Sequence, residues 1–171
     1  MYEGHTAIYA LNSYVWKLIE TNLGWSKSDY SGAVPIIPSS QQPELMNTKK
    51  PFLVYGSAGQ PFGNLYVQRR DSVSYNIYGQ TAKEVNDVVA LIADAFETQD
   101  QAADYVNQWL TTERNATGRD RGISFLSVRP IMSGRATAAA DEGGLVSAYC
   151  MVEIKYVSEN NAVTTGFTYT S

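Results

Sequence analysis

The strict alternation of apolar and polar residues from Leu145 to Val157 constrains the fold more than any other feature of the sequence. Successive side chains of a β-strand point to opposite faces of a sheet, so apolar residues at every second position predict a strand with one buried face. The positions between them include Ser147, Glu153 and Lys155, which suit a solvated face. The apolar positions of this segment are Val146, Ala148, Cys150, Val152, Ile154 and Tyr156.

Two earlier segments predict a β-hairpin. Residues 51–57 form a short apolar run. In residues 64–78 apolar side chains fall on positions of the same parity, so they share one face of a strand. Arg69 and Asp71 interrupt that parity, so we expect a bend or a bulge that turns both charges outward. A fourth strand is expected at residues 123–132. It should lie at an edge or an end of the sheet, because the proline within it cannot donate a ladder hydrogen bond.

Three segments predict helices. In residues 6–23 apolar side chains recur at three- and four-residue steps, which is the period of one helical face. We expect Thr6 to cap the start of this helix and Gly24 to end it in the left-handed conformation. Residues 81–97 begin with Thr-Ala-Lys-Glu, the pattern of a capping box, and continue with an apolar stripe. A second, short helix is expected at residues 101–111.

Two further segments lack a clear period. Residues 25–50 contain three prolines and are expected to form an arm or long loop, which either packs on its own chain or reaches a neighbouring subunit. Residues 158–171 form a Thr-rich C-terminal tail. A chain of 171 residues can bury one good core. Because the strands cluster in hairpins, we expect residues 1–171 to form a single α+β domain with a mostly antiparallel mixed sheet flanked by helices.

Composition argues against several classes of function. The formal net charge of −4 is opposite to the basic excess of a general nucleic-acid binder. No apolar run approaches the ~18 residues of a membrane span. His5 is the only histidine and Cys150 the only cysteine, so a nucleophile–base pair or a two-histidine metal site is absent. We therefore expect no enzymatic activity, no cofactor, no bound metal and no membrane partner.

Several elements together resemble a known family. They are the run Pro51-Phe52-Leu53-Val54-Tyr55, the strand Asn64–Tyr78 with its Tyr75-Asn76-Ile77-Tyr78 end, the helix at 81–97 and the strand at 145–157. In these elements and their order the chain resembles the tail terminator, or tail-completion, proteins of tailed bacteriophages. The resemblance implies an α/β subunit of a homohexameric ring that caps the tail tube, stops its growth and joins the tail to the neck.

The same resemblance implies the partners and the location of the protein. The partners are copies of the chain itself, the tail tube protein, a neck or connector protein and, in a contractile tail, the sheath protein. Genomic DNA would pass through the ring without specific binding. The protein would be made in the host cytoplasm and reside in the tail or neck of the virion.

A ring subunit needs two different complementary surfaces, because its interface is heterologous and closes by rotation. We expect arginines and apolar residues of the arm and tail to supply them. An acidic helical face turned to the lumen would repel the DNA backbone. The candidate interface residues are Arg69, Arg70, Arg114, Arg119, Arg121, Ile36, Ile37 and Phe167, and the candidate lumen-facing acids are Asp94, Glu97 and Asp104.

Two other functions fit the same sequence. A neck or head-completion connector would associate with portal or capsid instead of tail tubes. A small α+β ligand-binding module would use the many tyrosines to line a concave pocket and would be monomeric. The mass of the protein in solution separates a ring from a compact monomer.

Overall fold

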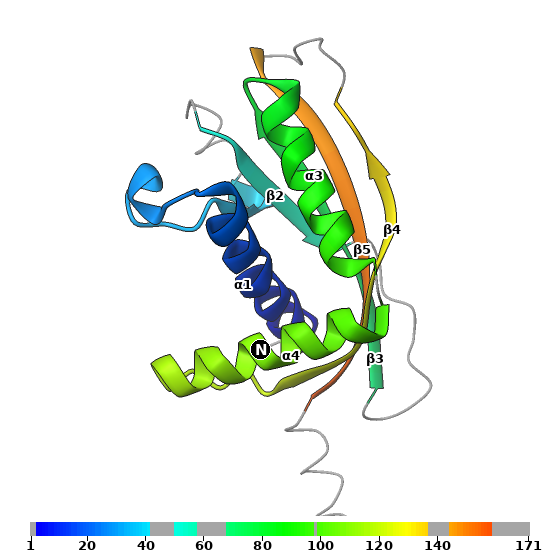
Figure 1. Ribbon diagram of the computed structural model, residues 1–171. Helices are drawn as coiled ribbons and strands as arrows, with labels where there is room; N and C mark the ends of the chain where they lie inside the picture. The colour runs from blue at the N-terminus through cyan, green and yellow to red at the C-terminus, as the bar shows by residue number, and fades with distance from the viewer. Residues whose placement is uncertain (1–2, 42–49, 58–67, 98, 137–143, 159–171) are drawn as a thin grey trace, which may run out of the picture.

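The alternating segment forms β5 (Val146–Ser158), an interior strand of a sheet that has five strands in the described part of the chain. The computed structural model describes residues 3–41, 50–57, 68–97, 99–136 and 144–158. In this part of the chain, β5 pairs antiparallel with β3 (Gln68–Gly79) on one side and with β4 (Ile123–Gly134) on the other. The sheet order is β1-β2-β3-β5-β4, and Figure 1 shows β5 running beside β4.

The predicted hairpin is confirmed, because β2 (Phe52–Ser57) pairs antiparallel with β3. The expected outward turn of the charges in β3 is wrong for Asp71. Its side chain is 2% exposed and accepts hydrogen bonds from the Ser57 hydroxyl and the Ser72 backbone N–H. These two donors satisfy the carboxylate, so β3 continues through this position in unbroken register with β5.

The strand expected around Pro130 is confirmed as β4, an edge strand of the sheet. Its pairing with β5 shifts register between Phe125 and Ser127 and again between Pro130 and Met132. Proline removes a backbone donor, and an edge strand tolerates that loss together with the irregular pairing.

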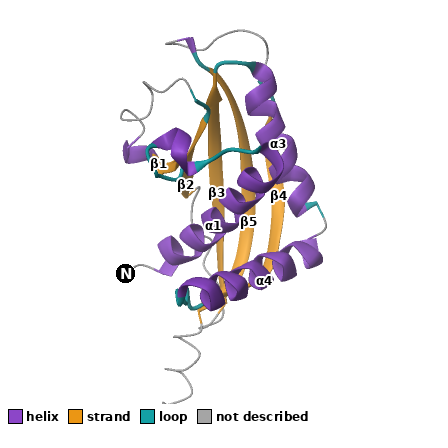
Figure 2. Ribbon diagram, turned by 60° about the vertical axis from the view of Figure 1, so that its left-hand side comes forward, coloured by secondary structure: helices purple, strands orange, loops and turns teal. Residues whose placement is uncertain are grey.

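Three helices of the described chain pack on one face of the sheet (Figure 2). They are α1 (Glu3–Leu23), α3 (Ala82–Phe96) and α4 (Gln99–Thr117). Their apolar stripes and the inward parity of the strands form one core. Its largest fully buried members are Tyr75, Phe96, Leu11, Ile19, Leu53, Ile77, Ile92 and Ile154. Within the described residues, no helix is long and apolar enough to cross a membrane.

The helix ends agree with the sequence in part. Gly24 follows α1 with φ +69°, as expected, but Thr6 does not cap that helix because α1 already begins at Glu3. The capping box of α3 is confirmed: Glu84 N–H donates to Thr81 Oγ1 (3.3 Å), and Thr81 N–H donates to Glu84 Oε2 (3.2 Å). Helix α4 is longer than expected, since it runs to Thr117 through a polar stretch.

The Pro-marked segment packs partly on its own chain. It contains two short 3₁₀ turns, Lys27–Tyr30 and Ser39–Gln41, and between them β1 (Ile36–Pro38), which pairs parallel with β2. The hydroxyl of Tyr30 donates a 2.6 Å hydrogen bond to the carbonyl of Pro51. Residues 42–49 of this segment and residues 159–171 of the tail lie outside the described residues.

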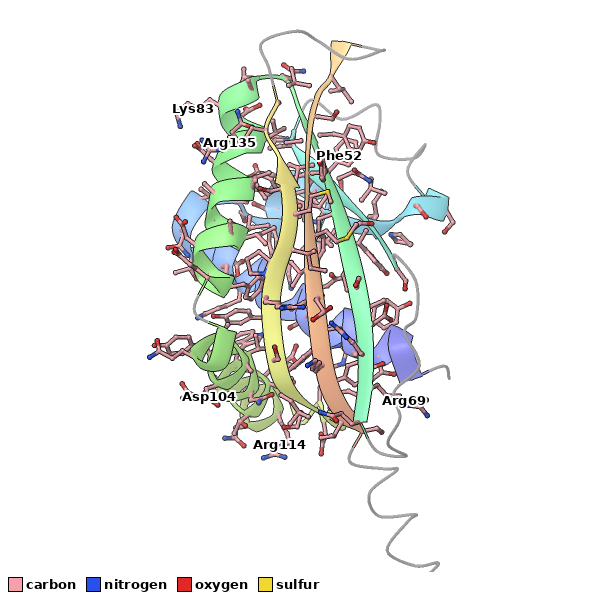
Figure 3. All side chains as sticks on the ribbon, turned by 90° about the vertical axis from the view of Figure 1, so that its right-hand side faces the viewer. Phe52, Arg69, Lys83, Asp104, Arg114 and Arg135 are labelled. Carbon is pink, nitrogen blue, oxygen red and sulfur yellow. The ribbon has the colours of Figure 1, made fainter. Side chains whose placement is uncertain are left out.

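The other face of the sheet carries none of the helices in the described chain, and Figure 3 looks onto β4, β5 and β3 with α1 behind them. A small apolar cluster on this face contains Ile37, Phe52, Val54 and Leu145, with Tyr78 packed against it. The rings of Phe52 and Tyr78 stack with centroids 5.3 Å apart. We call this side of the sheet the bare face.

Candidate functional site

The bare face carries an ionic triad. Glu153 on β5 lies directly opposite Arg129 on β4 and receives a 2.8 Å hydrogen bond from its Nε. Arg70 on β3 donates to the other carboxylate oxygen. Glu153 is 8% exposed, whereas the two arginine side chains are 40% and 39% exposed, so the triad presents a net positive charge to solvent. The triad places one predicted interface residue, Arg70, in a fixed geometry within its own subunit.

Sequence reasoning missed Arg129 and Glu153 as partners. The strand register brings them together, because both lie on the polar parity of neighbouring strands. The Nε of Arg70 is buried and has no hydrogen-bond partner among the described residues.

Large apolar side chains are exposed near the β4 edge. Leu126, Ile131 and Met132 on β4 are 46%, 45% and 53% exposed, and Tyr149 on β5 is 40% exposed. Tyr149 lies against the backbone of Gly134, where an added Cβ would be 2.2 Å from the Tyr149 ring. Among the described residues β4 has a strand neighbour on its β5 side alone. The Asn107 side chain of α4 occupies the Phe125 N–H and C=O of the other edge, so what β4 offers a partner is chiefly the exposed apolar area of Leu126, Ile131 and Met132.

The remaining predicted arginines do not form a single cluster. Arg69 is exposed at the start of β3, and Arg114 lies near the end of α4. Figure 3 shows both at the same end of the molecule, on different elements. Arg114 and Arg119 are exposed, and Arg114 lies 3.9 Å from Asp120. Arg121 is instead largely buried against Glu113. Exposed arginines at this end can therefore contact a partner, whereas Arg121 serves its own subunit.

The isoleucines of the arm, predicted to contact a neighbouring subunit, are instead buried in their own chain. Ile36 and Ile37 are buried at 8% and 9% exposure, Ile36 in the main core and Ile37 in the cluster on the bare face. Phe167 lies outside the described residues. The isoleucines therefore hold β1 to the sheet of their own chain.

The three predicted lumen-facing acids are all exposed. Asp94 lies in the last turn of α3, Glu97 follows that helix, and Asp104 lies in α4, so they border the α3–α4 connection. Upstream on α3, Asp87 is paired with Lys83 at 2.6 Å. Asp94, Glu97 and Asp104 thus place acidic groups on the outer side of the helical layer.

A groove of about 480 Å³ lies between α1, α4 and the β1–β2 edge. Aromatic residues Tyr9, Trp16, Tyr55 and Trp109 line it, and the rings of Tyr9 and Tyr55 meet edge to face at 6.4 Å. Tyr9 is 44% exposed, whereas Trp16 is 6% exposed. The groove combines an aromatic wall with open access from solvent.

A hydrogen-bonded chain fixes the α1–α4 side of this groove. Trp109 Nε1 donates to Ser13 Oγ (3.2 Å), and Ser13 Oγ donates to Glu113 Oε1 (2.8 Å). Arg121 binds both oxygens of Glu113 through Nε (2.8 Å) and a terminal nitrogen (2.9 Å). The hydrogen bonds from Arg121 lower the pKa of Glu113 below its ordinary value, against the opposing effect of burial.

The charges along the groove are unequal. Four cationic residues, Lys17, Lys27, Arg119 and Arg121, and two anionic residues, Glu20 and Glu113, line it, which leaves an excess of two positive charges. Lys17 Nζ lies 5.6 Å from the ring centroid of Tyr14 and 5.8 Å from that of Trp109. The groove suits an occupant that carries aromatic or aliphatic groups and no positive charge.

The described residues contain little that suits covalent catalysis. Burial raises the pKa of the Cys150 thiol to about 12, so it is protonated at neutral pH and shielded from solvent. Tyr75 is fully buried and donates a 2.7 Å hydrogen bond to Asn12, and burial raises its pKa. No group of three potential metal ligands occurs within the described residues.

No protein-family model matches the chain, and no curated protein matches it either.

Proposed function

We propose that this protein is a structural subunit of a tailed-bacteriophage virion, a tail terminator that forms a homohexameric ring on the end of the tail tube. The observation that carries the proposal is the exposure of four large apolar side chains along the β4 edge and the neighbouring bare face. Monomeric proteins rarely leave such a strand edge uncovered. The fold class also agrees with the α/β subunit that the family resemblance implies.

The two sides of the subunit differ, which supports a ring more than a twofold dimer. The β4 side offers Leu126, Ile131 and Met132, whereas the opposite side ends in the short β1 strand and the groove. A heterologous contact between two different surfaces closes into a ring when its rotation permits. Hexamer formation through the β4 side would cover its exposed apolar area.

The exposed acids give the ring a way to conduct DNA. With Asp94, Glu97 and Asp104 on the lumen, the duplex would meet like charges and pass without sticking. The exposed Arg114, on a different part of the subunit, would contact the tail tube, the neck protein or, in a contractile tail, the sheath.

Electron microscopy of the protein with tail tubes of the same phage tests this proposal. The full chain, labelled with gold through an added terminal tag, should bind the ends of the tubes as a six-fold ring and leave their walls bare. Binding to isolated necks or portals but not to tubes would favour a head-completion connector instead. Absence of binding to either would refute a virion joining role.

A small-molecule binding module is the second candidate, and the groove between α1 and α4 favours it. A volume of about 480 Å³ falls within the range of ligand pockets. This function predicts a monomer in which a small aromatic acid raises the melting temperature. A ring that no such compound stabilises would exclude it.

A further inference from the structure

The groove between α1 and α4 remains without an occupant in the assembly described above. One hydrogen-bonded chain through Ser13 and Glu113 holds the Trp109 indole and the Arg121 guanidinium in its wall. The indole Nε1 of Trp16, in the wall of the groove, is buried and has no acceptor among the described residues. A buried donor of this kind calls for an acceptor.

We propose that the groove binds residues 159–171 of a neighbouring copy of this chain. This inference rests on the proposed ring, in which each subunit must present two different surfaces. One surface would be the groove and the other residues 159–171. Together they would link successive subunits through a strap on the helical side, separate from contacts at the β4 edge.

The chemistry of the segment matches that of the groove. Residues 159–171 contain Glu159 and no lysine or arginine, so they bring no positive charge toward Lys17, Lys27 and Arg119. Val163, Phe167 and Tyr169 share one parity and would face the aromatic wall if the segment is extended.

The position at which the segment leaves the sheet makes the contact feasible. Ser158, the last residue of β5, pairs with Ile123, which is only two residues from Arg121 in the groove wall. Thirteen residues span at most about 40 Å when fully extended, and the proposal requires the groove of the adjacent copy to lie within that reach.

Cysteine cross-linking in the full chain tests the contact. The double variant Thr112→Cys/Thr168→Cys puts one thiol on the exposed groove side of α4 and one between the two aromatic residues of the segment. The native Cys150 does not interfere, because it is buried and its pKa is raised to about 12. Mild oxidation should give a ladder of covalent oligomers on a non-reducing gel.

Two controls define the specificity. Lys83→Cys/Thr168→Cys places the first thiol on α3, at the opposite end of the molecule from Arg114 (Figure 3). Its ladder should be at least ~10-fold weaker, because only the groove raises the effective concentration of the segment. Adding Phe167→Ala and Tyr169→Ala to the Thr112→Cys/Thr168→Cys variant should weaken its ladder to the same level.

The outcomes separate this inference from the proposed function. The mass of the reduced protein is measured independently, so a ring without a ladder would overturn the strap and leave the ring standing. An intrachain disulfide alone would show that the segment occupies the groove of its own chain and would overturn the exchange between copies. A monomer that forms no disulfide would also overturn the inference, and binding to tube ends would then decide the function.

Discussion

The substitution Glu153→Gln tests how strongly the ionic triad holds β3, β5 and the edge strand β4 together. Glu153 accepts hydrogen bonds from Arg70 on β3 and Arg129 on β4, and its side chain is 10% exposed. Glutamine keeps the shape and one acceptor oxygen but removes the negative charge. Two guanidinium groups would then lie close together without a counterion.

The structure sets the size of the expected loss. A hydrogen bond to a charged group contributes roughly 1.5–3 kcal/mol in a buried setting. Both arginine side chains are about two-fifths exposed, and solvent screening reduces each contribution to roughly 1 kcal/mol. We therefore expect the free energy of unfolding to fall by about 2 kcal/mol and the melting temperature by about 4–8 °C.

Urea unfolding followed by circular dichroism measures this loss, at a protein concentration held constant so that assembly does not vary. Asp104→Asn is the matched control, because it removes one exposed carboxylate on α4 and should leave the unfolding midpoint unchanged. A loss below about 0.5 kcal/mol for Glu153→Gln would refute the reasoning, since that is the range of an ordinary surface pair.

Three other substitutions or conditions give distinct results. Thr81→Ala removes the hydroxyl of the α3 capping box and should lower the free energy of unfolding by about 1 kcal/mol in urea, whereas Thr81→Ser should restore it; equal losses for both variants would contradict the capping role. Because burial raises the pKa of Cys150 from 9.0 to about 12, the unfolded chain loses this proton first. Stability should therefore fall as pH rises from 9 to 12, and Cys150→Ala, compared over the same range, should fall less steeply. Met132→Lys places a charge at the exposed β4 edge and should weaken self-association at least ~10-fold by analytical ultracentrifugation, without lowering the melting temperature at dilutions where both proteins are unassembled; unchanged association would remove that edge from the interface.

The parts of the fold that the sequence predicted are those determined by local periodicity. The alternation in β5, the apolar stripe of α3 and its Thr81–Glu84 capping box each depend on residues close in the chain, and the structure confirms them. The expected helix at 101–111 was too short. The stretch beyond it is polar because most of its residues face solvent, so it lacks a full apolar period even though it is helical to Thr117.

The candidate site depended on contacts that no local pattern encodes. Asp71 interrupts an apolar parity and was expected to turn outward, yet Ser57, fourteen residues away, supplies the hydrogen bond that keeps it buried. The pairing of Arg70 and Arg129 with Glu153 follows from strand register, and the groove follows from the packing of α1 against α4. The sequence therefore shows where the arginines lie along the chain, but it does not show which carboxylates they bind.

The length distribution of polymerising tail tubes tests the central claim most directly. Tube protein of the same phage is allowed to polymerise, the purified full chain is added partway, and tube lengths are measured by electron microscopy at later times. The account predicts that growth stops at the ends that acquire a ring, so the lengths stay at the values reached when the chain was added. Continued lengthening at the original rate, with the chain in excess over tube ends, would contradict it.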